Sequence, residues 1–226
     1  MTATPAINGR RQTDDASRVF LVRHGEVQNP DHIVYADLPG FPLSPTGRLQ
    51  AEQTAGRLPP DATVVTSPLE RAVETAGIIA SAGPGRLVVD ARLTEWRLAS
   101  RWAGRPWDAL DAAFPGELSD YLAHPRDLPF SPESLDELSL RITGSIRRHR
   151  LAISGPLVVV SHQDPIQAAR LLLTGRPLET LNTDKPQHAG IVELIARGEP
   201  PWVEIAMWAP LQPDVPPPTV FPPPGG

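Results

Sequence analysis

Short apolar runs alternate with segments of helical periodicity through most of the chain. The runs that we expect to form β-strands are Val19–Val22, Thr63–Thr66, Leu87–Val89, Leu157–Ser161, Ile191–Ile195 and Val203–Met207. Buried strands that alternate with helices are typical of a mostly parallel sheet with helices on both faces. The pattern therefore predicts an α/β fold, a three-layer α/β/α sandwich with a mostly parallel central sheet.

The starting residues of several helices support this pattern. Ser67 and Pro68 provide an N-cap and a first helical residue for a helix whose apolar stripe follows directly. Asp164 and Pro165 provide the same pair for a later helix, so we interpret Asp164 as an N-cap. Between these two helices, residues 134–137 read Ser-Leu-Asp-Glu, which predicts a capping box at the start of a long helix.

The two ends of the chain lack the alternating pattern. Residues 1–17 are polar without periodicity, which predicts a disordered leader. Residues 210–226 are dominated by proline, which favours an extended polyproline II tail over a packed element. Such a tail could bind a partner through an aromatic groove, although a solvated terminus is the simpler interpretation. We therefore expect one folded domain over residues 18–209.

Composition and charge exclude several classes of function. The net charge of −5 and the lack of any Lys/Arg-rich block argue against binding to nucleic acid or to a membrane surface. The chain has no cysteine, which excludes a disulfide framework, a thiolate nucleophile and a cysteine-based zinc site. With neither a signal peptide nor a membrane-spanning run, we expect a cytoplasmic protein that acts on a small molecule. A homodimer is compatible with the sequence.

Four of the histidines show no spacing typical of metal ligands. They are His32, His124, His149 and His188. A metal site is therefore not expected. We interpret His188, which lies just before the fifth predicted strand, as a structural residue.

The other two histidines each follow a predicted strand directly. The first strand runs into Arg23 and His24, and the fourth is followed by His162. Open parallel sheets bind ligands at the carboxyl ends of their strands, and the helix turn that carries Arg71 reaches the same edge. Arginine has forked donors that match phosphate oxygens, and helix N-termini add backbone N–H groups. The edge is therefore predicted to bind a small anion such as phosphate.

Five motifs follow one another along the core. They are Leu21-Val22-Arg23-His24-Gly25-Glu26, the segment Leu43–Ala51, Thr66–Ala72 with Thr75-Ala76, Leu93-Thr94-Glu95, and Val160-Ser161-His162. This ordered set resembles the histidine phosphatase superfamily, which includes the cofactor-dependent phosphoglycerate mutases. The resemblance implies a phosphomonoester hydrolase in which His24 accepts the phosphoryl group as a covalent phosphohistidine. It implies a small phosphorylated substrate and no metal or other cofactor.

The resemblance also implies roles for the residues around His24. Arg23 and Arg71 neutralise the equatorial phosphate oxygens, and His162, cationic beside the dianion, donates a further hydrogen bond. Glu95 is the general acid that protonates the leaving alkoxide and later deprotonates the attacking water. Catalysis is thus expected from His24, Glu95 and His162.

Some assignments stay open at this stage. Glu95 could instead pair with Arg92 or Arg97, which leaves Glu26 and Glu133 as reserve candidates for the acid. Two further residues are candidates for phosphate contact, namely Asn29 and the backbone N–H of Gln163. The family usually has small residues after its second histidine, where this chain has Gln-Asp-Pro.

The segment Trp96–Trp107 is rich in tryptophan and arginine and contains a displaced Trp-Ala-Gly element. It could cover an anionic or flat substrate, or it could simply cover the edge of the sheet. Two rivals to hydrolysis also remain: a phosphoglycerate mutase-type phosphoryl transfer, and a non-catalytic module that binds phosphate or a partner.

Overall fold

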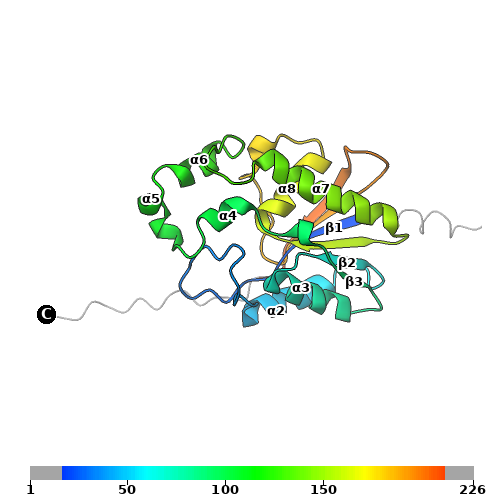
Figure 1. The fold of residues 1–226 in the computed structure, drawn as a ribbon. Coiled ribbons are helices and arrows are strands. Elements are labelled where there is room, and N and C mark those ends of the chain that lie inside the picture. Colours follow the sequence, from blue (N-terminus) through cyan, green and yellow to red (C-terminus); the bar gives the residue numbers. More distant parts are fainter. Residues whose placement is uncertain (1–16, 212–226) are drawn as a thin grey trace, which may run out of the picture.

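The computed structural model describes residues 17–211 and is built around one sheet of six strands (Figure 1). The strands are β1 (Arg18–Arg23), β2 (Thr63–Thr66), β3 (Leu87–Val89), β4 (Leu157–Ser161), β5 (Ile191–Ile195) and β6 (Val203–Trp208). Each predicted strand is confirmed within one residue at either end. The predicted leader before Ser17 and the predicted tail after Leu211 lie outside the described residues.

The sheet has the strand order β3-β2-β4-β1-β5-β6. β3, β2, β4 and β1 are mutually parallel, whereas β5 is antiparallel to both of its neighbours. β1 and β4 are adjacent at the centre, with Arg23 opposite Ser161 at their carboxyl ends. This register places the residues after β1 directly beside the residues after β4.

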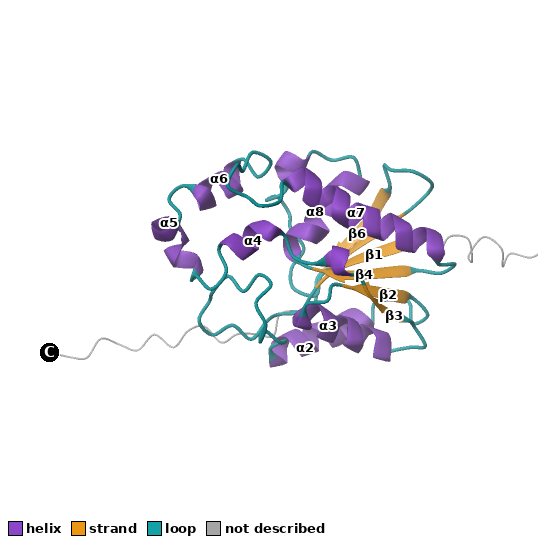
Figure 2. Cartoon of the chain, viewed as in Figure 1, coloured by secondary structure: helices purple, strands orange, loops and turns teal. Residues whose placement is uncertain are grey.

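Helices cover both faces of the sheet (Figure 2). α2 (Pro45–Ala55) and α3 (Glu70–Ser81) cover one face, and α7 (Leu135–Ala152) and α8 (Gln163–Leu173) cover the other. The short helices α4 (Arg97–Arg101), α5 (Leu110–Ala113) and α6 (Glu117–Ala123) lie off one end of the sheet. The three-layer prediction is confirmed. No helix within residues 17–211 is both long and apolar enough to cross a bilayer.

The strands divide their side chains between two apolar cores. In β1, Val19 and Leu21 join the core under α7 and α8, while Phe20 and Val22 join the core under α2 and α3. Alternate residues of a strand point to opposite faces, so a strand between two helical layers needs an uninterrupted apolar run. This is why β1 and β4 are recognisable from the sequence.

Two of the three predicted helix starts differ from the structure. The capping box at Ser134 is confirmed, with Ser134 and Glu137 each bonded to the other's backbone N–H. α3, however, begins at Glu70 with Leu69 as its N-cap, so the N-cap prediction for Ser67 is wrong. The Ser67 hydroxyl lies 2.8 Å from Nε2 of His162 instead.

The N-cap prediction for Asp164 is also wrong. β4 passes into α8 without a loop, so His162 takes the extended N-cap conformation and Asp164 falls in the first helical turn. Its carboxylate accepts hydrogen bonds from the hydroxyl of Tyr121 at 3.0 Å and from Nζ of Lys185 at 2.6 Å.

A close backbone contact joins the segment after β1 to the start of α2. A Cβ atom on Gly47 would lie 2.0 Å from the carbonyl oxygen of Glu26, and one on Gly25 would lie 2.5 Å from that of Gly47. Ser44 caps α2 here by accepting the N–H of Gly47 at 2.9 Å. The glycines of two sequence motifs therefore allow one backbone to rest on the other.

We expect Gly47→Ala to lower the free energy of unfolding by about 1–3 kcal/mol, because backbone atoms must move to admit the methyl group. Chemical denaturation measures the change. The control is Gly144→Ala in α7, where a Cβ would meet no atom within 4 Å. In a helix interior this control should gain up to about 1 kcal/mol. Equal stability of the two variants would contradict the crowding argument.

Candidate active site

A cavity of about 560 Å³ lies at the carboxyl ends of β1 and β4. Its charged and polar lining residues are Arg23, His24, Glu26, Gln28, Asn29, His32, Ser44, Glu95, Gln163, Asp164 and His188, and its apolar and aromatic ones are Val27, Pro30, Val34, Tyr35, Ala36, Ala99, Trp107 and Tyr121. These residues come from segments far apart in the sequence. Of the four residues predicted to gather at this edge, Arg23 and His24 line the cavity, while Arg71 and His162 do not line it but lie against the imidazole of His24.

The imidazole of His24 is held in one tautomer. Nε of Arg71 donates a hydrogen bond to its Nε2 at 3.2 Å, and its Nδ1 lies 2.7 Å from the carbonyl oxygen of Gly25. A guanidinium can only donate and a carbonyl can only accept, so Nδ1 carries the proton and Nε2 has the lone pair. Burial and the nearby charge of Arg71 hold the pKa of His24 well below its usual range. His24 is thus a neutral imidazole, as a nucleophile must be.

Both predicted arginines lie beside His24. Arg71, in the first turn of α3, donates to the carbonyl oxygen of Ala36 at 2.6 Å and lies over the ring of Tyr35 at 4.6 Å. Arg23 donates from Nη1 to the carbonyl oxygen of Pro186 at 3.2 Å. Its Nε is buried and has no hydrogen-bond partner within residues 17–211. Arg23 lines the cavity, whereas Arg71 does not line it and instead contacts the imidazole of His24.

His188 lines this cavity. Its interpretation as a structural residue did not predict this position. Its Nε2 lies 2.7 Å from Nη2 of Arg23, and its ring lies 5.8 Å from that of His24. Burial and the charge of Arg23 lower the pKa of His188 to about 3, so the ring is neutral and accepts from Arg23. The position of His188 follows from the topology of the sheet. β5 runs antiparallel beside β1, so the residues before Ile191 lie at the carboxyl end of β1.

His162 is fully buried next to His24, with their ring centroids 5.2 Å apart. Its Nδ1 has no hydrogen-bond partner among the described residues and lies 3.8 Å from Oε2 of Glu95. Burial and the charges of Arg71 and Arg23 hold the pKa of His162 well below its usual range. The positive charge predicted for His162 beside a phosphate dianion stays a prediction, since the charges of the two arginines act against it. A buried nitrogen without a partner is suited to contact a ligand.

Glu95 follows the short turn η1 (Ala91–Leu93) and faces the cavity with 15 % of its side chain exposed. Burial and the negative charge of Asp164 raise the pKa of Glu95 to about 7. Arg92 is paired with Asp90 instead, at 2.8 Å. Glu95 can therefore hold or release a proton near neutral pH, as a general acid and base must.

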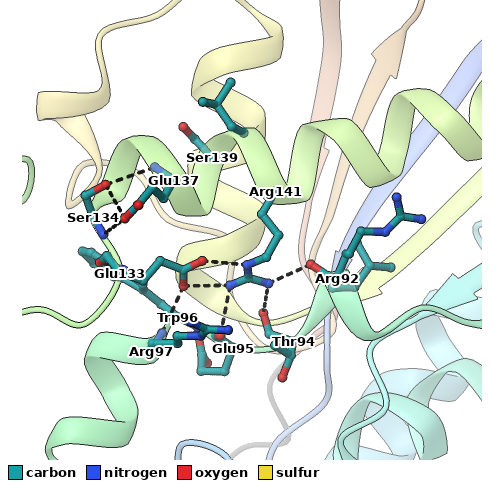
Figure 3. Close-up of polar contacts among 12 residues, drawn as sticks. Arg92, Thr94, Glu95, Trp96, Arg97, Glu133, Ser134, Glu137, Ser139 and Arg141 are labelled. Atoms are coloured by element: carbon teal, nitrogen blue, oxygen red, sulfur yellow. Dashed lines mark hydrogen bonds and ion pairs between the residues drawn. The ribbon is translucent and has the colours of Figure 1, made fainter.

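The reserve candidate Glu133 has another task (Figure 3). It lies outside the cavity wall and forms a bidentate ion pair with Arg141, at 2.7 and 2.9 Å. Arg141 also donates to the carbonyl oxygens of Arg92, Thr94 and Glu95, at 2.7, 3.1 and 3.3 Å. The pair thus fixes the backbone that carries Glu95.

The other candidates also line the cavity. Glu26 accepts the hydroxyl of Ser44 at 2.6 Å. The side chain of Asn29 both donates to and accepts from the backbone of Ile33, at 2.9 and 3.2 Å. Gln163 stands at the N-terminus of α8 and lines the cavity. The structure places all three within reach of a ligand in the cavity.

The tryptophan-rich segment is divided between the core and the cavity. Trp96 and Trp102 are 1 % and 2 % exposed and belong to the core, whereas Trp107 is 46 % exposed and lines the cavity. Ala99 of α4 also lines it. No group of histidine, aspartate and glutamate side chains within residues 17–211 is arranged to hold a metal ion.

Comparison with known sequences connects this geometry to a family. The model of the histidine phosphatase superfamily (branch 1) matches residues 19–206. An uncharacterized protein of Mycobacterium tuberculosis is 36% identical over 167 residues, which cover 73% of this chain and 82% of that protein. A putative phosphoserine phosphatase 2 of Hydrogenobacter thermophilus is 29% identical over 187 residues, covering 80% of this chain and 91% of that protein.

Solved structures show the same fold. The mycobacterial glucosyl-3-phosphoglycerate phosphatase in complex with VO3 has a TM-score of 0.73 at 24% identity, covering 86% of this chain and 100% of that one. The phosphoserine phosphatase of Entamoeba histolytica in complex with 3-phosphoglyceric acid has a TM-score of 0.71 at 22% identity, covering 84% and 95%. These likenesses confirm the predicted architecture.

Proposed function

Because this chain belongs to branch 1 of the histidine phosphatase superfamily, we propose that it hydrolyses phosphomonoesters through a covalent phosphohistidine on His24. The family and its named relatives indicate phosphatase or mutase activity. The observation that carries the finer proposal is the tautomer of His24, a buried neutral imidazole whose Nε2 lone pair faces the guanidinium of Arg71. Such a nitrogen is ready to attack phosphorus without a prior proton transfer.

In the first step, Nε2 of His24 attacks phosphorus and the bond from phosphorus to the alcohol oxygen breaks. The Nδ1–H group donates to the carbonyl oxygen of Gly25, 2.7 Å away, and so stabilises the positive charge that the ring acquires. Glu95, with a pKa of about 7, transfers its proton to the departing oxygen. The products of this step are phosphohistidine and a neutral alcohol.

Charge on the transferring phosphoryl group is balanced by fixed donors. Arg71 and Arg23 supply cations, and both are already oriented by contacts to Ala36 and His188. Nδ1 of His162 becomes a donor when the Ser67 hydroxyl donates to its Nε2. Phosphoryl transfer requires mainly such positioning and charge stabilisation, so these groups can supply most of the catalysis.

In the second step, water attacks phosphorus and the bond to Nε2 of His24 breaks. Glu95, deprotonated by the first step, accepts a proton from the attacking water. The products are inorganic phosphate and the original neutral His24, and Glu95 is again protonated. A carboxyl with a pKa near the working pH is suited to both of its roles.

The test is to trap the intermediate. We expect the protein, incubated with a ³²P-labelled phosphomonoester and denatured in alkali, to carry label that is stable in base and lost in mild acid. Inorganic phosphate should be released in parallel. Transfer of the label to phosphoglycerate instead of water would indicate the mutase. Absence of both label and phosphate across a broad panel of monoesters would overturn the proposal and favour a binding module.

A further inference from the structure

The outer part of the cavity contains carboxylates but no free cation. Arg23 is the only arginine or lysine in the described chain that lines the cavity, and it belongs to the phosphate end with Arg71. The carboxylates of Glu26, Glu95 and Asp164 also line the cavity, and that of Asp164 is paired with Lys185. A substrate that carried a second anionic group would therefore find no free cation among the described lining residues and would meet the unpaired charge of Glu26.

The nearest additional cation is already engaged. Nζ of Lys185 lies 2.6 Å from Oδ1 of Asp164 and 2.5 Å from the hydroxyl of Tyr121, and 13% of the Lys185 side chain is exposed. The positive charge of Lys185 is neutralised by the carboxylate of Asp164, and its ammonium group points at Asp164 and Tyr121. Lys185 is thus not available to a substrate carboxylate while Asp164 is ionised.

Glu26 has no such neutralising partner. Its Oε1 accepts the hydroxyl of Ser44, and its carboxylate forms no ion pair within residues 17–211. The backbone N–H of Glu26 is bonded to the side chain of Gln50 at 2.9 Å, which fixes this residue at the wall. A like charge placed nearby in a half-buried site would be repelled.

The lining of the cavity also includes aromatic side chains. Trp107 is 46% exposed at the cavity, and its ring packs edge-on against buried Trp102 with 6.4 Å between centroids. Tyr35 is held between Arg71 and the ring of Phe41, at 4.6 and 5.4 Å. Ordered aromatic rings that face a cavity are suited to bind a flat or apolar group.

We propose that the preferred substrate is a phosphomonoester whose organic group has no negative charge and packs a flat or apolar surface on Trp107. This inference rests on the proposed hydrolysis through His24. It separates this chain from the named neighbours, because the 3-phosphoglyceric acid and phosphoserine bound by the Entamoeba histolytica structures each carry a carboxylate.

The experiment compares substrates in matched pairs at pH 6.5, where Glu95 with its pKa of about 7 is mostly in the acid form. Glycerol 1-phosphate is paired with 3-phosphoglycerate, and phenyl phosphate with 4-carboxyphenyl phosphate, so that each pair differs by one carboxylate. We expect kcat/KM to be roughly 10- to 100-fold higher for the member without the carboxylate. Phenyl phosphate should exceed glycerol 1-phosphate beyond the difference due to its better leaving group.

Variants assign the discrimination to individual residues. Glu26→Gln removes an unpaired negative charge, so it should lower the ratio of kcat/KM between the uncharged and the carboxylate member of each pair. Asp164→Asn should lower this ratio further, because it frees the ammonium of Lys185 for a substrate carboxylate. Trp107→Leu should lower kcat/KM for phenyl phosphate about 10-fold and leave that for glycerol 1-phosphate nearly unchanged.

The outcomes separate this inference from the proposed function. Equal or faster hydrolysis of the carboxylate members would overturn the charge argument while hydrolysis itself stood. If Trp107→Leu lowered kcat/KM equally for phenyl phosphate and glycerol 1-phosphate, the proposed contact with Trp107 would be overturned. If no monoester is hydrolysed, the proposed function fails. Calorimetric binding of the same pairs to His24→Ala then applies the test without turnover.

Discussion

Replacement of His24 by alanine is expected to lower phosphate release by more than about 10⁴-fold, which is the scale of losing a covalent nucleophile. Water must then attack the substrate directly, since the neutral nitrogen that Arg71 orients, Nε2 of His24, is gone. The variant should also carry no acid-labile label. The measurement is single-turnover phosphate release together with the label assay described above.

Two controls make the result specific. His124→Ala changes a histidine that caps the end of α6 and does not line the cavity, so it should retain full activity. Phosphate should still bind to His24→Ala, because Arg23 and Arg71 remain. Undiminished label on His24→Ala would show that another residue accepts the phosphoryl group.

Glu95→Gln is expected to slow hydrolysis of alkyl phosphates by about 10²- to 10⁴-fold, the usual contribution of general acid catalysis. The amide has no proton that it can transfer to a leaving alkoxide. For p-nitrophenyl phosphate, whose leaving group needs no proton, the phosphorylation step should slow less than about 10-fold. The two substrates should therefore differ in their response, and the measurement is the rate of phosphohistidine formation.

The same residue predicts the pH dependence of that step. Burial and Asp164 raise the pKa of Glu95 to about 7, so its acid form prevails below that pH and is lost above it. In the wild type, phosphorylation by an alkyl phosphate should fall as the pH rises through about 7, and Glu95→Gln should lack this limb. Glu70→Gln, at an exposed position in α3, should leave the profile unchanged. Equal slowing of both substrates would exclude Glu95 as the acid.

Much of the fold could be predicted because its signals are local. β1 and β4 lie between two helical layers, so each shows as an unbroken apolar run that a reader can find within a few residues. His24 and His162 follow these strands directly. Parallel pairing of the two strands then brings the imidazoles together without further information.

The errors arose where a side chain has its partner far away in the sequence. Ser67 looks like an N-cap to its own helix, but its hydroxyl contacts His162, which is 95 positions away. Asp164 is likewise paired with Lys185 and Tyr121 from other segments. Local capping rules cannot anticipate contacts of this kind, since they depend on how the layers pack.

His188 and Trp107 illustrate a second limit. His188 reaches the cavity because β5 pairs antiparallel with β1, an arrangement that a run of apolar residues does not reveal. Trp107 differs from Trp96 and Trp102 in exposure, although all three share one tryptophan-rich segment. The composition of the segment suggested that it lies near the site, but only the packing shows which tryptophan lines the cavity and which two are buried in the core.

The adjacency of β1 and β4 also bears on how the protein acquires activity. β1 begins the described chain, whereas β4 follows only after β2, β3 and the helices up to α7, so this central pair joins segments far apart in the sequence. Contacts between distant segments form late in folding, because closing a long loop costs entropy before any packing compensates it. In a partly folded chain without this strand pair, His24 and Arg71 would not yet lie beside His162. Recovery of turnover during refolding would therefore follow the closure of the central strand pair, and not the earlier appearance of helices.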